Sequence, residues 1–331
     1  MARSAAPTVV PAETDAERLR AAFAADAARG LSRRPFTMPS QYLYDDLGSS
    51  LFEAICHLPW YPITRAEKGL LARHAPAILR AAGRPLTIVE LGCGTGEKLD
   101  LLLDAWDSEH GDLKVTLIDI SAAALRQSAR LIASRGAARV LCLQALYEDG
   151  LQQTAGDSSR GRLVLFLGSN LGNFDLRDAA AFLQRLGAGL GSGDSLLLGV
   201  DLVKPEPVLQ LAYDDPLGVT AAFNLNVLSR MNRELGADFD LAGFAHRVAW
   251  DPERQRVEMH LVSRRRQAVN VEGAGCRVDF EPGESIWTES SYKYTLGGIQ
   301  RMLREAGLVI SAAWTDDEAA FALLLCGRAD A

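Results

Sequence analysis

The chain has 331 residues, of which 48% are hydrophobic and 23% are charged, and its formal net charge is -7. These proportions are close to those of folded globular proteins, which excludes a disordered chain. The apolar runs, such as 163–167 and 196–200, are far shorter than the roughly 20 residues that a bilayer crossing needs. We therefore expect two globular domains, or one domain with a large insertion, and no contact with a membrane.

The distribution of charge and of cysteines indicates which partners and which cellular compartment to expect. The one dense basic run, Arg264, Arg265 and Arg266, has no interleaved aromatic residues, so nucleic acid is not expected as a partner. The five cysteines are odd in number, far apart and without CxxC spacing, which predicts neither a disulfide framework nor a metal site. No apolar segment of a secretory signal follows Arg3, so we expect a cytoplasmic protein. No apolar stripe marks a partner surface, and we expect a monomer.

The predicted elements begin with helices and continue as alternating strands and helices. Apolar residues at helical spacing predict a helix over 13–28, with Gly30 as its stop, and further helices over 49–58 and 64–81. Short apolar runs separated by helical stretches then predict strands at 86–91, 114–120, 139–144, 163–168 and 195–202. Continuous apolar strands that alternate with helices are typical of a parallel sheet covered on both faces.

This alternation ends after Val203. Residues from 204 to about 240 have the pattern of helices and loops, and 243–294 alternate as in an antiparallel sheet. A helix over 296–306 and strands over 308–314 and 320–326 return to the first pattern. The simplest architecture is a doubly wound α/β domain whose chain leaves after the fifth strand, builds an α+β lobe and returns. We divide the chain into 1–65, 66–203, 204–294 and 295–331, with the first and third parts forming the inserted lobe.

A glycine-rich turn follows the first predicted strand. Gly92, Gly94 and Gly96 stand between this strand and a helix in the string IVELGCGTGEK, where glycines allow a tight turn and close approach of a ligand. The spacing is not the GxGxxG that sets a pyrophosphate on a helix N-terminus. Glu90 lies just before the glycines, and a carboxylate there suits the cationic amino-acid end of S-adenosylmethionine. The loop therefore favours this cofactor, and a nicotinamide-dependent oxidoreductase remains the alternative.

A second acidic residue, Asp119, ends the next predicted strand. A carboxylate at this position can accept hydrogen bonds from both ribose hydroxyls of a bound nucleoside. It would serve a nicotinamide cofactor equally well, so it does not separate the two alternatives. Asp119 can instead cap the following helix, although Ser121 is also placed to do so.

Several long strings give the chain a more specific resemblance. They are YLYDDLGSSLFEAICHLPWYPITRAE, ELGCGTGEK, LFLGSNLGNF, LGVDLVKPEPVLQLAYDDPLGVTAAFNLNVL, RVEMHLVS and TESSYKY. With them, the chain from about Pro39 to Arg328 resembles the histidine-specific Nα-methyltransferases of ergothioneine biosynthesis. The resemblance implies a Rossmann-like methyltransferase sheet with an inserted substrate-binding domain. It also implies S-adenosylmethionine as the cofactor and a free amino acid, with histidine favoured, as the substrate.

The resemblance also implies ligand contacts at matching positions. Together with the glycine turn, the cofactor contacts are Tyr44, Glu90, Gly92, Gly94, Gly96, Lys98, Asp119 and Gln144. Gln144 is included because this chain reads Gln144-Ala145-Leu146-Tyr147 where the family has an Asp-Phe pair near the adenine. Asn173 and Tyr213 would hold the amino and carboxylate groups of the substrate, and Tyr61, Met259, Glu289 and Ser291 would meet its imidazole ring. We expect Tyr44, Asn173 and Tyr213 to take part in catalysis.

Three of these residues have simpler alternatives. Asn173 can cap a helix, Met259 can be plain core, and Glu289 can form an ion pair with Lys293. The family pattern is also broken at Tyr61-Pro62-Ile63 and at Ser290, which leaves tryptophan or tyrosine open as the substrate.

The expected chemistry is an in-line displacement at a sulfonium, for which alignment and exclusion of water matter most. An α-amine is mostly protonated at neutral pH, so one proton must leave before each attack. We expect no dedicated strong base, with Tyr44 or a water relaying the proton, and three successive methylations of histidine. A catalytically silent regulator that senses the cofactor is a further alternative.

Overall fold

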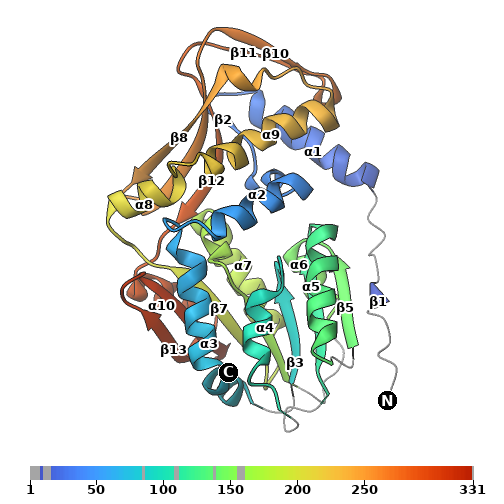
Figure 1. Cartoon of the computed structure of the whole chain (residues 1–331), viewed down its shortest axis with the longest axis vertical. Helices are drawn as coiled ribbons and strands as arrows, with labels where there is room; N and C mark the ends of the chain where they lie inside the picture. Colours follow the sequence, from blue (N-terminus) through green and yellow to red (C-terminus); the bar gives the residue numbers. More distant parts are fainter. Residues whose placement is uncertain are drawn as a thin grey trace. The chain divides into compact units, whose positions relative to one another are not determined.

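The computed structural model describes residues 8–9, 16–83, 86–107, 112–136, 139–154 and 161–329. The chain divides into two compact units, and most of their elements are labelled in Figure 1. Unit 1 comprises Met1–Ala12, Pro62–Val203 and Lys293–Ala331, and unit 2 comprises Glu13–Tyr61 and Lys204–Tyr292. The bounds differ from the division at 65 and 294 by a few residues, and the short strand Thr8–Val9 belongs to the sheet of unit 1.

Unit 1 is built on an eight-stranded sheet with the order β1-β5-β4-β3-β6-β7-β14-β13. The strands in this order are Thr8–Val9, Arg139–Gln144, Lys114–Asp119, Leu86–Leu91, Gly161–Phe166, Ser195–Asp201, Phe321–Arg328 and Leu308–Asp316. Neighbours from β1 to β7 are parallel, and β14 is antiparallel to both β7 and β13. This confirms the expected doubly wound α/β sheet.

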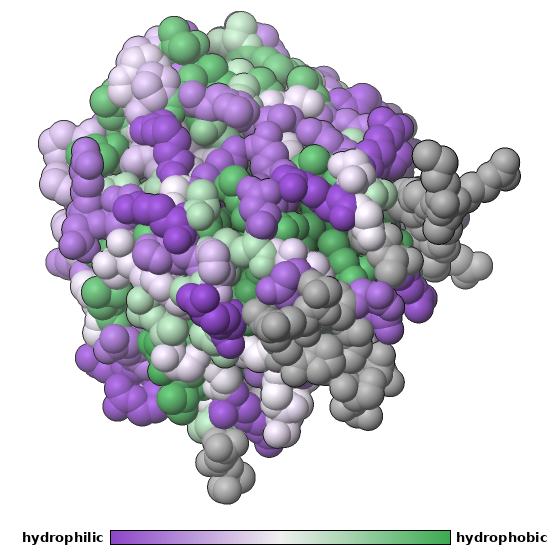
Figure 2. Space-filling model, turned by 60° about the horizontal axis from the view of Figure 1, so that its bottom comes forward, coloured by the Kyte–Doolittle hydropathy of each residue, from purple (hydrophilic) through white to green (hydrophobic). Residues whose placement is uncertain are grey.

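Helices form two layers on the sheet of unit 1. One layer contains α3 (Pro62–Ala82), α4 (Glu97–Leu103) and α5 (Ala122–Ser134), which contact one another in sequence. The other contains α6 (Tyr147–Gln152), α7 (Leu176–Gly189) and α10 (Leu296–Glu305), and α7 contacts both of its neighbours. The helices are amphipathic, as α7 shows by burying Ala179, Phe182, Leu183 and Leu186 at helical spacing. On the face of the molecule drawn in Figure 2, hydrophilic and hydrophobic residues are interspersed.

The strand order creates a switch point beside β3. The chain moves from β3 outward to β4 and β5, and then returns to the other side of β3 with β6 and β7. The connections that leave β3 and β6 therefore diverge, and in open α/β sheets ligands bind outside the carboxyl ends of such strands. The turns after Leu91 and Phe166 lie at this point.

Unit 2 contains α1 (Ala16–Leu31), α2 (Asp46–Cys56), α8 (Glu206–Tyr213) and α9 (Val219–Leu235). Its sheet has the order β2-β12-β9-β8, made of Phe36–Thr37, Ser285–Tyr292, Arg256–Ser263 and Phe244–Asp251. A separate antiparallel pair consists of β10 (Gln267–Val271) and β11 (Cys276–Phe280). Strands β8, β9 and β12 are antiparallel, as the alternating sequence predicts. Among the described residues, no helix combines the length and apolar character that a membrane span requires.

Two helix boundaries differ from the sequence prediction for physical reasons. Gly30 lies inside α1 and does not stop it; a β-carbon there would lie 2.1 Å from the carbonyl oxygen of Thr37, so glycine is needed for close packing on β2. The second helix begins three residues earlier than expected, at Asp46, because Asp45 caps it by accepting a hydrogen bond from the Gly48 amide.

Candidate functional site

The glycine turn after β3 is shaped by three left-handed residues. Gly92, Gly94 and Gly96 have φ values of 74°, 51° and 81°, in the region that side chains rarely adopt. A β-carbon at Gly96 would lie 2.5 Å from Ser128 Oγ on α5, whereas one at Gly94 would meet no atom within 4 Å. Gly96 therefore packs the turn against α5, and the backbone at Gly94 is open for a ligand to approach.

Glu90 is a buried carboxylate on β3 beside this turn. The side chain is 2% exposed, and Oε2 has no hydrogen-bond partner among the described residues. Burial raises the pKa of Glu90 to about 8, although the nearby Lys98 ammonium acts in the opposite direction. A buried acceptor without a partner is costly, and a cationic ligand group would satisfy it.

Asp119 ends β4 next to the glycine turn. Its two carboxylate oxygens accept hydrogen bonds from the amides of Ser121, at 2.9 Å, and Gly94, at 3.1 Å. Ser121, and not Asp119, caps α5 by accepting from the Ala124 amide, so the capping alternative for Asp119 is wrong. The Cys93 thiol also donates weakly to the oxygen that binds Gly94, with a sulfur–oxygen distance of 3.9 Å. Burial raises the pKa of Asp119 and these amide bonds lower it, with burial the stronger.

Two residues at the end of β5 and just after it, Gln144 and Tyr147, make contacts of different kinds. The Gln144 amide donates to the carbonyl of Ile120 at 3.0 Å, which ties the ends of β4 and β5 together. The Tyr147 hydroxyl lies next to the glycine turn, because a β-carbon on Gly92 would lie 3.2 Å from it. Burial raises the pKa of Tyr147, so its hydroxyl stays protonated and can donate. Sequence reasoning missed this residue, although it stands in the Gln144-Ala145-Leu146-Tyr147 stretch where the family has an Asp-Phe pair.

A second turn at the switch point follows β6 and carries two asparagines. The 3₁₀ helix Asn170–Asn173 forms there, and α7 begins afterwards with Asp175 at its N-cap position. Asn173 therefore does not cap α7. A β-carbon on Gly92 would lie 3.1 Å from Nδ2 of Asn170, so this amide faces the glycine turn. Asn170 was not predicted, and its place in the same GSNLGN string is the signal that could have found it.

In unit 2, five of the predicted substrate residues cluster. The hydroxyls of Tyr213 and Ser291 are hydrogen-bonded at 2.8 Å, and the Tyr61 and Tyr213 rings meet edge to face with centroids 6.2 Å apart. On the sheet, Glu289 of β12 lies opposite Met259 of β9. All five side chains are buried. Met259 is thus a core residue that also neighbours Glu289.

A β-bulge sets the direction of Glu289. The register of β12 against β9 shifts between Trp287 and Glu289, so Thr288 and Glu289 are both buried although they are consecutive. Bulges redirect side chains in this way and are frequent beside active sites. The ammonium of Lys293, which we considered as the partner of Glu289, lies 2.9 Å from Asp201.

A network of hydrogen bonds holds the backbone of Tyr213. His246 Nε2 donates to the Tyr213 carbonyl at 2.9 Å, and Nδ1 accepts from the Asn224 amide at the same distance. Asn224 also accepts from the Thr288 hydroxyl at 2.6 Å, next to Glu289. This pattern requires a neutral imidazole, in agreement with burial that lowers the pKa of His246. Asp214 and Asp215 act on that pKa in the opposite direction.

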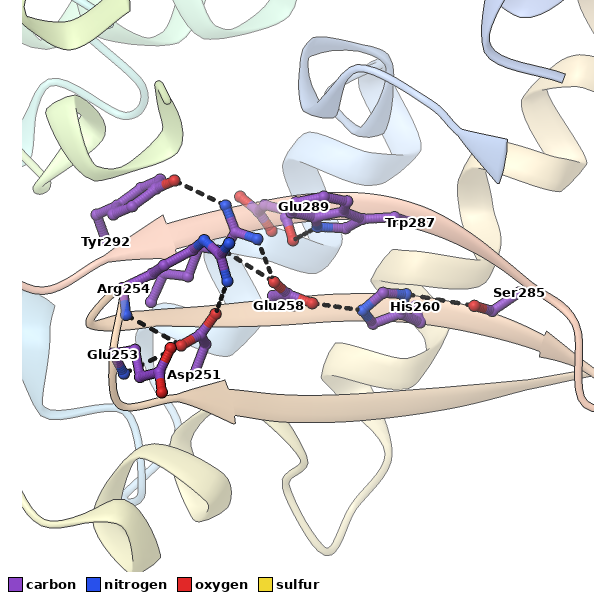
Figure 3. Close-up of polar contacts among 10 residues, drawn as sticks. Asp251, Glu253, Arg254, Glu258, His260, Ser285, Trp287, Glu289 and Tyr292 are labelled. Carbon is purple, nitrogen blue, oxygen red and sulfur yellow. Dashed lines mark hydrogen bonds and ion pairs between the residues drawn. The ribbon is translucent and has the colours of Figure 1, made fainter. Parts of the chain in front are cut away.

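The other face of the same sheet carries a charged ladder, shown in Figure 3. The Arg256 guanidinium lies over the Trp287 ring, 4.4 Å from its centroid, and donates to Glu258. Glu258 accepts in turn from His260 at 3.0 Å. The Trp287 indole donates to the backbone carbonyl of Glu289 at 2.9 Å. The ladder therefore holds the bulge from the side opposite to the buried Glu289 carboxylate.

An aromatic group surrounds Tyr44 in unit 2. The Tyr44 ring meets Phe52 and Phe223 edge to face, with centroids 5.4 and 5.3 Å away, and Phe52 in turn meets Tyr61. Aromatic faces of this kind attract cations such as ammonium groups. Phe52 and Phe223 were not predicted, because an isolated phenylalanine on an amphipathic helix is indistinguishable from core in a sequence.

The two units thus carry different chemical capacities. Unit 1 offers an open glycine turn, an unsatisfied buried carboxylate and a strand-end carboxylate, which together fit the amino-acid and ribose parts of S-adenosylmethionine. Unit 2 offers hydroxyls, a carboxylate and aromatic faces, which fit a small polar molecule with a ring. Within the described residues, no group of three or more His, Cys, Asp or Glu side chains could hold a metal ion.

A doubly wound sheet with this glycine turn and these carboxylates defines an S-adenosylmethionine-dependent methyltransferase. The chain belongs to the family of histidine-specific, S-adenosylmethionine-dependent methyltransferases, whose model matches residues 23–328. The family and cofactor predictions are therefore confirmed, and the oxidoreductase alternative is wrong.

Curated relatives cover most of the chain. It is 41% identical over 318 residues to a histidine N-alpha-methyltransferase from Mycolicibacterium smegmatis, covering 96% of this chain and 97% of the relative. It is 30% identical over 266 residues to ergothioneine biosynthesis protein 1 from Schizosaccharomyces pombe, covering 77% of this chain and 34% of that protein. It is 26% identical over 323 residues to an L-tryptophan methyltransferase from Psilocybe serbica, covering 87% of each.

Proposed function

We propose that the protein transfers methyl groups from S-adenosylmethionine to the α-amino group of free L-histidine. Three transfers would give the trimethylated betaine used in ergothioneine biosynthesis. The observation that carries the substrate is the buried cluster of unit 2, in which the hydrogen-bonded Tyr213 and Ser291 neighbour Glu289 and Met259. A carboxylate and a hydroxyl can bind both ring nitrogens of an imidazole, and unpaired buried groups would reject an apolar side chain.

The cofactor residues of the proposal lie in unit 1. Glu90 would bind the ammonium group of the cofactor, the glycine turn its backbone, and Asp119 the ribose hydroxyls. Lys98, at the second position of α4, carries the charge that suits the cofactor carboxylate. The bound cofactor supplies a methyl group on a positively charged sulfur. Tyr44 and Gln144 are proposed as further cofactor contacts, and Gln144 also holds the end of β5 by its hydrogen bond to Ile120.

The remaining residues would orient the amine. Asn173 and Tyr213 are proposed to bind the amino and carboxylate groups of the substrate, and Tyr61 and Ser291 to contact its ring. An α-amine has a pKa of about 8, so one proton must leave before each transfer. The aromatic faces near Tyr44 would favour a growing cation without donor groups that oppose it. Alignment then does most of the catalytic work.

Incubation of the protein with S-adenosylmethionine and a panel of free amino acids tests this proposal. Mass spectrometry should detect histidine with one, two and three added methyl groups, and no methylated tryptophan or tyrosine. If only tryptophan or tyrosine is methylated, the substrate is instead an aromatic amino acid, the alternative that Pro62, Ile63 and Ser290 leave open. Absence of every methylated histidine would refute the proposal.

Location and assembly complete the proposal. All five cysteines are free thiols, which supports a reducing compartment, and we propose a cytoplasmic enzyme. We further propose that it acts as a monomer, which light scattering of the purified protein would test.

A further inference from the structure

A buried carboxylate in unit 1 has no role in the contacts described so far. Glu67 of α3 is 0% exposed. Both of its oxygens accept from the Gly168 amide, at 2.8 and 2.9 Å, and Oε2 lies 2.6 Å from the Lys98 ammonium. One side chain therefore joins the helix that follows the glycine turn to the turn that follows β6.

The sheet leaves room for this carboxylate. A β-carbon at Gly199, on β7, would lie 2.0 Å from Glu67 Oε1, which is closer than any non-bonded contact. Glycine at this strand position therefore allows the carboxylate to reach Gly168 and Lys98. A glycine inside a buried strand weakens the strand, and it often marks a close approach by another group.

The turn that Glu67 binds is conformationally strained. Gly168 has a φ of 80° and is followed by Ser169 with a φ of 57°, a left-handed value that is uncommon for serine. Ser169 Oγ accepts from the Asp201 amide at 2.9 Å, and the Asp201 carboxylate pairs with Lys293. The strained turn is thus held on one side by the Glu67 carboxylate and on the other by the Asp201 backbone amide, and the 3₁₀ helix that carries Asn170 and Asn173 starts from it.

Stability alone does not explain the ion pair between Glu67 and Lys98. Two charges removed from water gain little net stability from their attraction. Lys98 also keeps 24% of its side chain exposed, so its ammonium is held by Glu67 and remains accessible. Glu67 contacts Lys98 and the turn that leads to Asn173. In the proposed function, Lys98 binds the cofactor and Asn173 binds the substrate.

We infer that Glu67 is a positioning residue for methyl transfer, which fixes the left-handed turn at Gly168 and orients Lys98. The inference rests on the proposed function only for the roles of Lys98 and Asn173. Glu67 does not touch the reacting atoms, and Gly199 is the position that makes its placement possible.

Two variants reach the same carboxylate by different routes. Glu67→Gln keeps an oxygen for the Gly168 amide but turns an amide donor toward Lys98. Gly199→Ala changes no polar group and displaces the carboxylate by steric overlap. Glu97→Gln is the matched control, because it removes the partly exposed ion pair between Lys68 and Glu97, which also joins α3 to α4.

The measurement is kcat per cofactor-binding site, counted by calorimetric titration with S-adenosylhomocysteine, together with the Kd of that ligand. Because small misplacements of reacting groups are costly, we expect kcat per site to fall about 10- to 100-fold in both variants. We expect a smaller change, about 3- to 10-fold, in Kd, since Lys98 keeps its charge. The control should stay within about twofold in both quantities. A merely structural role would lower the number of binding sites and leave kcat per site unchanged.

The hydrogen bond between the Gly168 amide and Glu67 can be followed directly by NMR. In protein labelled with ¹⁵N-glycine, the Gly168 amide proton should resonate downfield, and this signal should move upfield in Gly199→Ala. Values of kcat per site within about twofold of the parent in both variants would overturn the inference. If the parent methylates no amino acid of the panel, the proposed function fails by itself. The inference is then decided by Kd and the amide signal, and unchanged values of both would overturn it.

Discussion

Binding of the cofactor should remove a proton from Glu90, and this makes cofactor affinity depend on pH. Burial raises the pKa of Glu90 to about 8 from an ordinary value of 4.5. In the cofactor-free protein, the neutral acid therefore stabilises the fold below 4.5, and this contribution is lost as the pH rises toward 8. A bound ammonium group reverses the preference, because it favours the carboxylate.

The magnitude follows from the distance between the pKa and the working pH. At about pH 7, roughly nine in ten free molecules carry the neutral acid, and one pKa unit corresponds to about 1.4 kcal/mol. Ionising Glu90 at about pH 7 therefore costs about 1.4 kcal/mol, and the cofactor should bind about tenfold more weakly than it does with the carboxylate already ionised. Nearly one proton should be released for each molecule bound.

Calorimetric titration with S-adenosylhomocysteine measures both quantities. Titrations in two buffers of different ionisation enthalpy give the number of protons released, and a series between about pH 6 and 7.5 stays below the pKa of the ligand amine. Glu90→Gln cannot ionise, so its affinity should be independent of pH in this range. Equal proton release by the parent and Glu90→Gln, or a parent Kd that does not vary with pH, would refute the reasoning.

Three further predictions concern substrate selection and stability. Glu289→Ala should raise the KM for histidine about tenfold or more and affect an apolar amino acid less, because the imidazole loses a charged acceptor; equal effects in steady-state assays would contradict the role. Protonation of His246 breaks the hydrogen bond from Asn224, and because burial lowers its pKa below the ordinary 6.5, urea unfolding should show stability lost as the pH falls below 6.5. This loss should be absent in His246→Gln. Lys293→Met leaves Asp201 buried without its cation and should lower the free energy of unfolding by about 3 to 5 kcal/mol; a chemical-denaturation value under about 1 kcal/mol would show that the pair is not needed.

Local patterns in the sequence were enough for the parts of the fold that depend on neighbouring residues. The strands over 86–91 and 139–144 have the predicted bounds, because a continuous apolar run is needed wherever a parallel strand is covered on both faces. The fourth parallel strand ends at Phe166, two residues before the predicted end. Gly168 and Ser169 adopt left-handed values there, and the sequence does not distinguish such a turn from the last residues of a strand.

Long-range contacts were beyond the reach of the sequence. Glu67 and Gly168 are 101 positions apart, and no local pattern joins them. The burial of Glu289 depends on a bulge, and because side chains alternate along a strand, one inserted residue reverses every later assignment. Gln144 was expected at the adenine because the family has an Asp-Phe pair in this stretch, and that role stays a prediction. Its hydrogen bond to Ile120 joins two strands, so the local sequence did not reveal it. The ligand roles of the predicted site residues stay predictions until the variants are measured.

The antiparallel end of the large sheet has a consequence for synthesis of the protein. Strand β7 ends at Asp201, but its outer neighbour β14 begins only at Phe321. While the ribosome makes the intervening residues, the apolar edge of β7 has no partner and can pair with another nascent chain. Early folding of the intervening segment would bring the two ends of the gap together and shorten this exposure. Variants that slow the folding of unit 2 should therefore reduce yield through aggregation of unit 1.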